Sequence, residues 1–318
     1  MTAPSGAAPP RAVPGERALD LLALGETMAL VVPARPEPLE DAEDFHVASG
    51  GAESNVACHL AAAGHRAAWA SALGDDALGR RVRRDIAARG VDVSAVSTDP
   101  SAPTGLYVKD PGRGVVYHRA GSAASRMGPP TLERLDLATA RIVHLTGITL
   151  ALSESCRALV HAAIAAARAA GALVSLDVNH RPALWGSTAE AAREIRTAAA
   201  QADVLLVGRD EAEVLWGTAT PDTIRELFPD VPHLVVKDAD VEAVEYEGTA
   251  RTAVPTPRVD VVEPVGAGDA FAAGWLDGLL RGEGAEERLI RGHASAARVL
   301  SSTKDLPAPG AEEGDTTR

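Results

Sequence analysis

The sequence predicts an α/β protein whose central sheet is mostly parallel and is covered by helices on both faces. Two observations support this fold class. Short apolar runs of strand length alternate with longer alanine-rich stretches of helix length along the chain. In addition, 46% of the 318 residues are hydrophobic, which is enough for a sizeable core. Because aromatic residues make up only 3% of the chain, that core must consist of Ala, Leu and Val.

The expected elements follow this alternation in order. Continuous apolar runs that end in Gly, Asn or Asp predict buried strands at 19–25, 67–74, 141–147, 172–179, 202–208 and 233–238. Longer alanine-rich stretches between and after them predict helices at 54–63, 77–89, 153–170, 189–200, 210–216, 269–281 and 286–301.

Two stretches interrupt the alternation, at about 28–48 and 104–120. The second contains a hairpin, with strands expected at 105–109 and 115–119 around the turn sequence DPGRG. Inserted strands of this kind predict a small β lid that projects from the main sheet and covers a site. One domain is expected over 17–306. Residues 1–16 and 307–318, rich in Pro, Ala and Gly or in polar residues, are expected to be disordered.

Charge and composition exclude several classes of protein. The formal net charge of −13 argues against nucleic acid as a partner, since phosphate backbones require a basic surface. No apolar run reaches the length of a membrane span, and the first residues lack the apolar stretch of a secretion signal. Cys58 and Cys156 lie far apart and are expected to be buried thiols, so the predicted location is the reducing cytoplasm.

Three motifs stand at or near strand ends, where open parallel sheets bind ligands. GGAESNVACHLAAAG places Gly50 and Gly51 before Asn55 in the first turn of a helix. LDVNHRPALW places Asp177, Asn179 and Arg181 after a buried strand, and VVYHRAGSAAS places Tyr117 and Arg119 on one face of a strand. Taken singly, each motif also fits a structural interpretation: a capped helix, a polar loop or an exposed strand.

The stretch EPVGAGDAFAAG carries the most specific chemistry. Gly266, Ala267 and Gly268 lead into a helix, so their backbone N–H groups are expected to form an anion-binding site at its positive end. Asp269 follows at once and is placed to take a proton from an attacking hydroxyl. The stretch is not a Walker A loop, because no Gly-Lys-Ser/Thr follows. It is not a dinucleotide fingerprint either, because Phe271 stands at the third glycine position.

GGAESNVACHLAAAG and EPVGAGDAFAAG together resemble the two signatures of the ribokinase-like (PfkB) sugar kinases, in the same order and far apart. The resemblance extends over roughly residues 19–307 and implies a three-layer α/β sandwich with a β lid. Within the family, GGAESN, LYV, VVYHRAGSAAS, HLTGITLALS and LDVNHRPALW most resemble kinases of 2-dehydro-3-deoxygluconate (KDG).

The resemblance implies a role for each matching residue. Asp269 would be the catalytic base, and Gly266, Ala267 and Gly268 the anion hole. The sugar acid would contact Gly50, Gly51, Asn55, Tyr107, Tyr117, Arg119 and Arg181, with Arg181 alternatively meeting the transferred phosphoryl group. The nucleotide would contact Lys237, Gly266, Gly268 and His293, and Glu211 would act indirectly on the metal.

The nucleotide half departs from the family pattern. Gly208 stands where the family has Asn, three residues before Glu211. In KDADVEA, Ala239 and Glu242 occupy the positions of two loop glycines, and Glu242 is placed to repel nucleotide phosphates.

These observations lead to one functional hypothesis and two alternatives. We expect an enzyme that uses ATP and Mg²⁺ to phosphorylate KDG at its terminal hydroxyl. The alternatives are a PfkB kinase for another sugar, such as fructose or ribose, and a sugar-acid binding protein with weak catalysis. A homo-oligomer formed through the lid is expected, with neither nucleic acid nor membrane as a partner.

Overall fold

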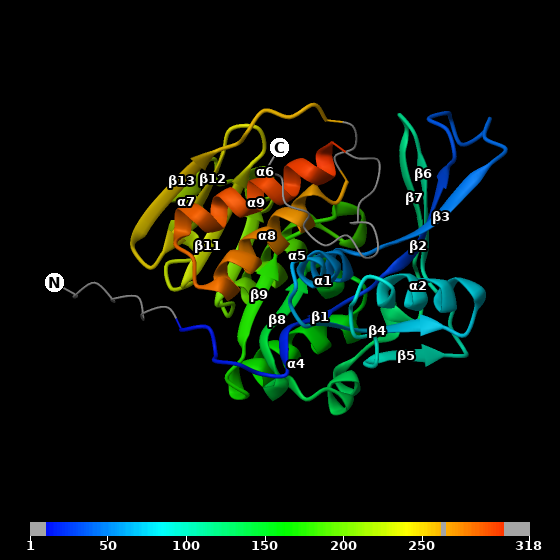
Figure 1. Ribbon diagram of the computed structural model, residues 1–318, viewed down its shortest axis with the longest axis horizontal. Coiled ribbons are helices and arrows are strands. Elements are labelled where there is room, and N and C mark those ends of the chain that lie inside the picture. Colours follow the sequence, from blue (N-terminus) through cyan, green and yellow to red (C-terminus); the bar gives the residue numbers. More distant parts are fainter. Residues whose placement is uncertain (1–10, 262–264, 302–318) are drawn as a thin grey trace.

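A nine-stranded sheet forms the centre of the computed structural model, which describes residues 11–261 and 265–301 (Figure 1). Across the sheet the strands are β13 (Ala250–Pro255), β12 (Glu242–Glu247), β11 (His233–Asp238), β10 (Val204–Gly208), β9 (Leu173–Asp177), β8 (Ala140–Thr146), β1 (Leu19–Leu24), β4 (Ala67–Gly74) and β5 (Val96–Asp99). The strands from β11 to β5 run parallel to their neighbours, while β12 and β13 pair antiparallel at one edge. The mostly parallel sheet is therefore confirmed.

Helices cover both faces of this sheet and create two hydrophobic cores. On one face lie α3 (Gly147–Ala151), α4 (Glu154–Ala169), α5 (Thr188–Ala199), α6 (Arg209–Trp216) and α7 (Pro221–Leu227). On the other lie α1 (Ala52–Ala62), α2 (Ala77–Ala87), α8 (Ala267–Arg281) and α9 (Ala285–Leu300). Short 3-10 helices occur at Ala124–Arg126, Pro129–Arg134, Leu137–Thr139 and Pro182–Leu184.

The continuous apolar strands of the sequence follow from this double cover. In β1, Leu22 and Leu24 belong to the core beneath α4 and α5, whereas Leu21 and Ala23 belong to the core beneath α1 and α8. Alternate side chains point to opposite faces of a strand, so a strand covered on both sides is apolar at every position. The three-layer α/β prediction is confirmed.

The predicted lid is a separate four-stranded sheet (Figure 1). Its strands, in order, are β3 (Phe45–Gly50), β2 (Met28–Pro33), β6 (Leu106–Asp110) and β7 (Gly114–His118). Strand β2 runs antiparallel to β3 and parallel to β6, and β6 and β7 form the expected hairpin. In the view of Figure 1 the lid projects beside α1 and α2, away from the β11–β13 edge.

Some elements were not expected from the sequence. The strand pair β12 and β13 was missed because β12 reads EAVEYE, in which charges interrupt the apolar pattern. Glu245 is nevertheless fully buried, since it accepts hydrogen bonds from the guanidinium of Arg288 and from the indole N–H of Trp275. A buried carboxylate is tolerated when such partners satisfy it.

The ends of the chain are described in part. Of the segments expected to be disordered, residues 1–10 and 307–318 lie outside the described residues. In the described part of the N-terminal segment, the guanidinium of Arg11 lies 3.1 Å from the carboxylate of Asp203. Cys58 and Cys156 are buried free thiols, as expected. Among the residues that the structure describes, no helix combines the length and the apolar character that crossing a membrane requires.

Candidate active site

A cavity of about 760 Å³ opens between the lid and the edge of the main sheet where the parallel strands end. This volume suits a small-molecule site. Most residues expected at the site line the cavity: Gly50, Gly51, Asn55, Tyr107, Tyr117, Arg119, Arg181, Glu211, Lys237, Gly266, Gly268 and Asp269. Ala267 and His293 are not among its lining residues.

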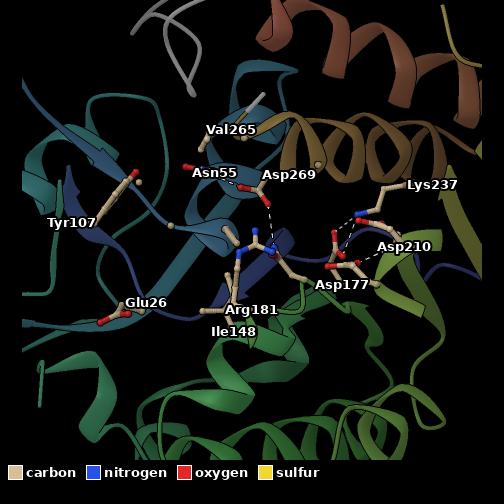
Figure 2. Close-up of a pocket in the computed structure, with 18 of the residues that line it drawn as sticks. Glu26, Asn55, Tyr107, Ile148, Asp177, Arg181, Asp210, Lys237, Val265 and Asp269 are labelled. Carbon is tan, nitrogen blue, oxygen red and sulfur yellow. Dashed lines mark hydrogen bonds and ion pairs between the residues drawn. The ribbon is translucent and has the colours of Figure 1, made fainter. Parts of the chain in front are cut away.

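Asp269 lies in the middle of this cavity, in the first turn of α8 (Figure 2). Its carboxylate accepts a hydrogen bond from the side-chain amide of Asn55 at 2.8 Å and a longer one from that of Asn179 at 3.4 Å. Asn179 adopts a positive φ of 39°, a conformation that Asn tolerates better than most residues. Two amides from different motifs therefore orient this carboxylate.

The surroundings of Asp269 raise its pKa to about 7. The largest cause is removal from solvent, and the carboxylate of Asp177 adds to it. The amide of Asn55 and the charges of Arg181 and Lys237 act in the opposite direction. A carboxylate with a pKa near neutrality can accept a proton from a hydroxyl more readily than an ordinary aspartate.

The N-terminus of α8 faces the cavity with the backbone N–H groups of its first turn. The helix begins at Ala267, two residues earlier than expected, because Gly266 precedes it with a φ of 86° that favours glycine. The N–H groups of the first helical turn have no carbonyl within the helix to bind. A Cβ on Gly268 would lie 3.9 Å from the ammonium nitrogen of Lys237, so this turn faces a cation. Together they form a site suited to an anion. Residues 262–264, including Glu263 and Pro264 of the motif, lie outside the described residues.

Lys237 and Asp177 form the charged pair at one end of the cavity. The ammonium nitrogen lies 2.8 Å and 3.1 Å from the two oxygens of Asp177. Asp177 is the last residue of β9, and Lys237 stands next to the last residue of β11. Burial opposes the charge of Lys237, but the carboxylates of Asp177 and Glu211 hold its pKa above the ordinary value. Lys237 is therefore a half-buried ammonium group that its carboxylate neighbours keep charged.

Glu211 is anchored by two backbone N–H groups. His180 donates to one carboxylate oxygen at 2.7 Å and Gly208 donates to the other at 2.8 Å. Burial nevertheless raises the pKa of Glu211. A Cβ added to Gly208 would lie 2.6 Å from Oδ1 of Asp210. The carboxylate of Asp210 thus occupies the space that a side chain at position 208 would take.

The opposite end of the cavity is built from lid residues. A Cβ on Gly50 would lie 2.0 Å from the hydroxyl of Tyr107, so a glycine is required there. The rings of Tyr107 and Tyr117 stack with centroids 5.8 Å apart, and the guanidinium of Arg119 lies 5.6 Å from the Tyr117 ring. In Figure 2, Tyr107 and Glu26 lie on one side of Asp269, and Lys237, Asp177 and Asp210 on the other.

Glu26 was not expected at the site. Its buried carboxylate lines the cavity and is paired with Arg119. The sequence contains a signal for it, since Glu26 is a polar residue directly after the predicted strand at 19–25. Asp210 and Asp238 were also missed, although Asp210 follows the end of β10 and Asp238 is the last residue of β11.

His293 and the turn after β11 complete the expected nucleotide residues. The ring of His293 is buried against Phe271, and its Nε2 lies 3.2 Å from the carbonyl oxygen of Val254. Ala239 lines the cavity with a φ of 40°, a backbone conformation that favours glycine. Glu242 instead belongs to β12 and lies 3.4 Å from the guanidinium of Arg251.

Residues 18–308 match the model of the pfkB family carbohydrate kinases. The chain belongs to this family. Two relatives named 2-dehydro-3-deoxygluconokinase, from Thermoproteus tenax and Bacillus subtilis, are each 35% identical to it. The alignments cover 93% and 91% of this chain and 94% and 91% of the relatives.

A solved structure and a kinase named for another sugar are also similar to this pfkB-family chain. The crystal structure of a PfkB protein from Polaromonas sp. JS666 is 37% identical, with a TM-score of 0.82, and the match covers 89% of this chain and 96% of that one. A fructokinase-1 from Zea mays is 32% identical over 84% of this chain and 86% of its own. The family is thus established as carbohydrate kinases, and the relatives include kinases named for different sugars.

Proposed function

We propose that the protein is an ATP-dependent sugar-acid kinase that phosphorylates KDG at its terminal hydroxyl to give 2-dehydro-3-deoxy-6-phosphogluconate. The observation that carries the proposal is the position of Asp269 between two ends of one cavity, each of which carries a cation. On one side Arg119 and the tyrosines of the lid suit a carboxylated sugar. On the other side Lys237 and the N-terminus of α8 suit a phosphoryl group.

In this proposal the residues at the centre act on the hydroxyl. Asp269 removes its proton, and the amides of Asn55 and Asn179 hold the carboxylate in place. Oδ1 of Asn55 is buried and has no hydrogen-bond partner among the described residues, so it is free to accept a hydrogen bond from a sugar hydroxyl. The backbone N–H groups at the start of α8 and the charge of Lys237 stabilise the negative charge of the transferred phosphoryl group.

The phosphate end of the cavity also fits Mg²⁺. Asp177, Asp210, Glu211 and Asp238 all line it, and carboxylate oxygens are the protein ligands that Mg²⁺ prefers. We propose that these residues hold the metal directly or through water, and that the metal neutralises nucleotide phosphates when bound. We also propose that His293 lies near the adenine of the bound nucleotide.

A coupled assay of ADP release tests this function. With ATP and Mg²⁺ present, KDG is compared with 2-keto-3-deoxygalactonate, gluconate, fructose and ribose. We expect kcat/KM to be highest for KDG. Higher kcat/KM for fructose or ribose would support the second candidate, a kinase for a neutral sugar, which the fructokinase among the relatives favours. Binding of KDG without ADP release would support the sugar-acid binding protein.

We also propose that two copies associate through the lid. Phe45, Val116 and Tyr117 are large apolar side chains of the lid that are 41%, 45% and 48% exposed. Sedimentation velocity of Val116→Glu should show a monomer where the unmodified protein is a dimer. Val214→Glu, at an exposed position of α6 outside the lid, is the matched control and should sediment as the unmodified protein does.

A further inference from the structure

Glu26 is held by three side-chain contacts in the link between β1 and β2. Its Oε2 accepts a hydrogen bond from Nε of Arg119 at 2.7 Å and also contacts Nη2 of the same guanidinium. Its Oε1 accepts a hydrogen bond from the hydroxyl of Ser122 at 2.6 Å. Both oxygens of this buried carboxylate are therefore engaged by the protein, so Glu26 is poorly placed to bind a substrate itself.

The space around Glu26 is kept clear by glycines. A Cβ on Gly51 would lie 2.3 Å from the carbonyl oxygen of Glu26, and a Cβ on Gly105 would lie 2.9 Å from its Oε1. A side chain at either position would displace the carboxylate or its backbone. Close packing on two sides thus determines where Glu26 lies. In an ion pair at the surface, by contrast, the side chains are free to move.

The contacts of Glu26 determine which part of Arg119 remains available. Glu26 occupies the Nε–Nη2 edge of the guanidinium, and Nη1 has no hydrogen-bond partner among the described residues. The guanidinium is planar and rigid, so fixing one edge also fixes the direction of the other. The free edge is the one that can bind a second carboxylate.

We propose that Glu26 is a specificity-determining positioning residue, which holds Arg119 so that its free edge receives the carboxylate of the sugar acid. This inference rests on the proposed function, because it requires a carboxylated substrate. Glu26 acts through Arg119 and does not touch the substrate. It also offsets part of the charge of Arg119, so that the pair remains compatible with burial before the substrate binds.

A purely mechanical role is the alternative explanation. Glu26 stands before the lid strand β2 and Arg119 follows the lid strand β7, so the ion pair also joins the lid to the rest of the domain. Another contact joins the same two parts outside the cavity: Nη2 of Arg81, on α2, donates to the carbonyl oxygen of Val47, on β3, at 2.7 Å. Arg81→Ala therefore provides a matched control for the loss of a lid contact.

Steady-state kinetics with KDG and ATP separate the two explanations. Glu26→Ala should raise KM for KDG roughly tenfold, while kcat and KM for ATP change less than about twofold. Glu26→Gln keeps the shape and an acceptor for Arg119, so its KM for KDG should stay within about threefold of the unmodified value. Inhibition by the uncharged methyl ester of KDG should be equally strong in all three proteins.

A double variant keeps the test decisive if Glu26→Ala does not fold, because removing both charges leaves no buried charge unpaired. Arg119→Ala and Glu26→Ala/Arg119→Ala should have the same KM for KDG. A further increase of KM in the double variant would overturn the inference. The inference would also be overturned if Glu26→Ala lost affinity equally for KDG, its methyl ester and ATP. Such a uniform loss is expected for Arg81→Ala if that variant loosens the lid. If the unmodified protein does not phosphorylate KDG, the proposed function itself fails.

Discussion

The side-chain amide of Asn55 donates a hydrogen bond of 2.8 Å to the carboxylate of Asp269, across a sequence separation of 214 residues. This contact joins the two motifs by which the chain resembles PfkB kinases. Asn55 is in the first turn of α1 and Asp269 in the first turn of α8, and these two helices pack side by side on one face of the sheet. The helix pair therefore positions the base that we propose for the reaction.

Replacing Asp269 by Asn tests that base. Asp269→Asn keeps the size and polarity of the side chain but cannot take a proton from the substrate. We expect kcat to fall at least about a hundredfold, with little change in the dissociation constant for the sugar. Single-turnover kinetics and equilibrium binding measure the two quantities separately. If most of the turnover remained, Asp269 would have no part in proton transfer.

The pH dependence of kcat/KM should report the pKa of Asp269. The base acts only when deprotonated, and its pKa is about 7, so activity should rise with pH up to that value and then level off. Asn55→Ala removes a donor that favours the ionised form. It should therefore move the acidic limb to higher pH. An acidic limb near pH 4 in the unmodified protein would contradict this assignment.

The same pKa makes a prediction about stability. Because the folded-state pKa of Asp269 is raised from 3.8 to about 7, the folded protein retains this proton where the unfolded chain has lost it. Protonation of Asp269 therefore contributes to the free energy of unfolding. This contribution is fully present below about pH 4 and is lost as the pH rises through about 7. Asp269→Asn should therefore exceed the unmodified protein in free energy of unfolding by at least about 1 kcal/mol at pH 8.

Chemical denaturation at pH 5 and pH 8 measures this difference. The advantage of Asp269→Asn should be larger at pH 8 than at pH 5, because only at the higher pH must the folded protein carry the charged carboxylate. An equal difference at both pH values would show that the carboxylate is already ionised in the folded protein at pH 5.

Gly50→Ala tests the close approach at the sugar end. The added methyl group would lie 2.0 Å from the hydroxyl of Tyr107, so the ring must leave its present position. We expect KM for the sugar to rise roughly tenfold or more, with KM for ATP unchanged. Gly128→Ala is the matched control, because its methyl group would meet no heavy atom closer than 3.6 Å. Unchanged sugar kinetics in Gly50→Ala would argue against a substrate contact of Tyr107.

Ala239→Gly tests the turn that follows β11. Ala239 has a φ of 40°, which costs a non-glycine residue roughly 1 kcal/mol, and glycine removes that strain while adding some entropy to the unfolded chain. The free energy of unfolding should stay the same or increase by up to about 1 kcal/mol. Denaturant titration measures the change, and a clear loss of stability would show that the methyl group makes necessary contacts.

Much of the fold and part of the site could be predicted from the sequence. The alternation of apolar strands with alanine-rich helices determines a parallel sheet with two covered faces, because strand and helix periods are local properties of the chain. The sequence GAGD likewise determines a glycine-led helix start with a carboxylate in its first turn. These features depend on neighbouring residues and on backbone conformations that only glycine adopts readily.

The remaining features were decided by tertiary structure, because they depend on residues that are far apart in the chain. The pairing of Glu26 with Arg119 spans 93 residues and follows from the lid lying over the end of β1. Likewise, β12 is recognisable only once Arg288 and Trp275 satisfy Glu245. The pKa of Asp269 arises from burial and from Asp177, which are properties of the assembled cavity. Sequence determined which groups are present, and packing determined which of them meet and with what charge.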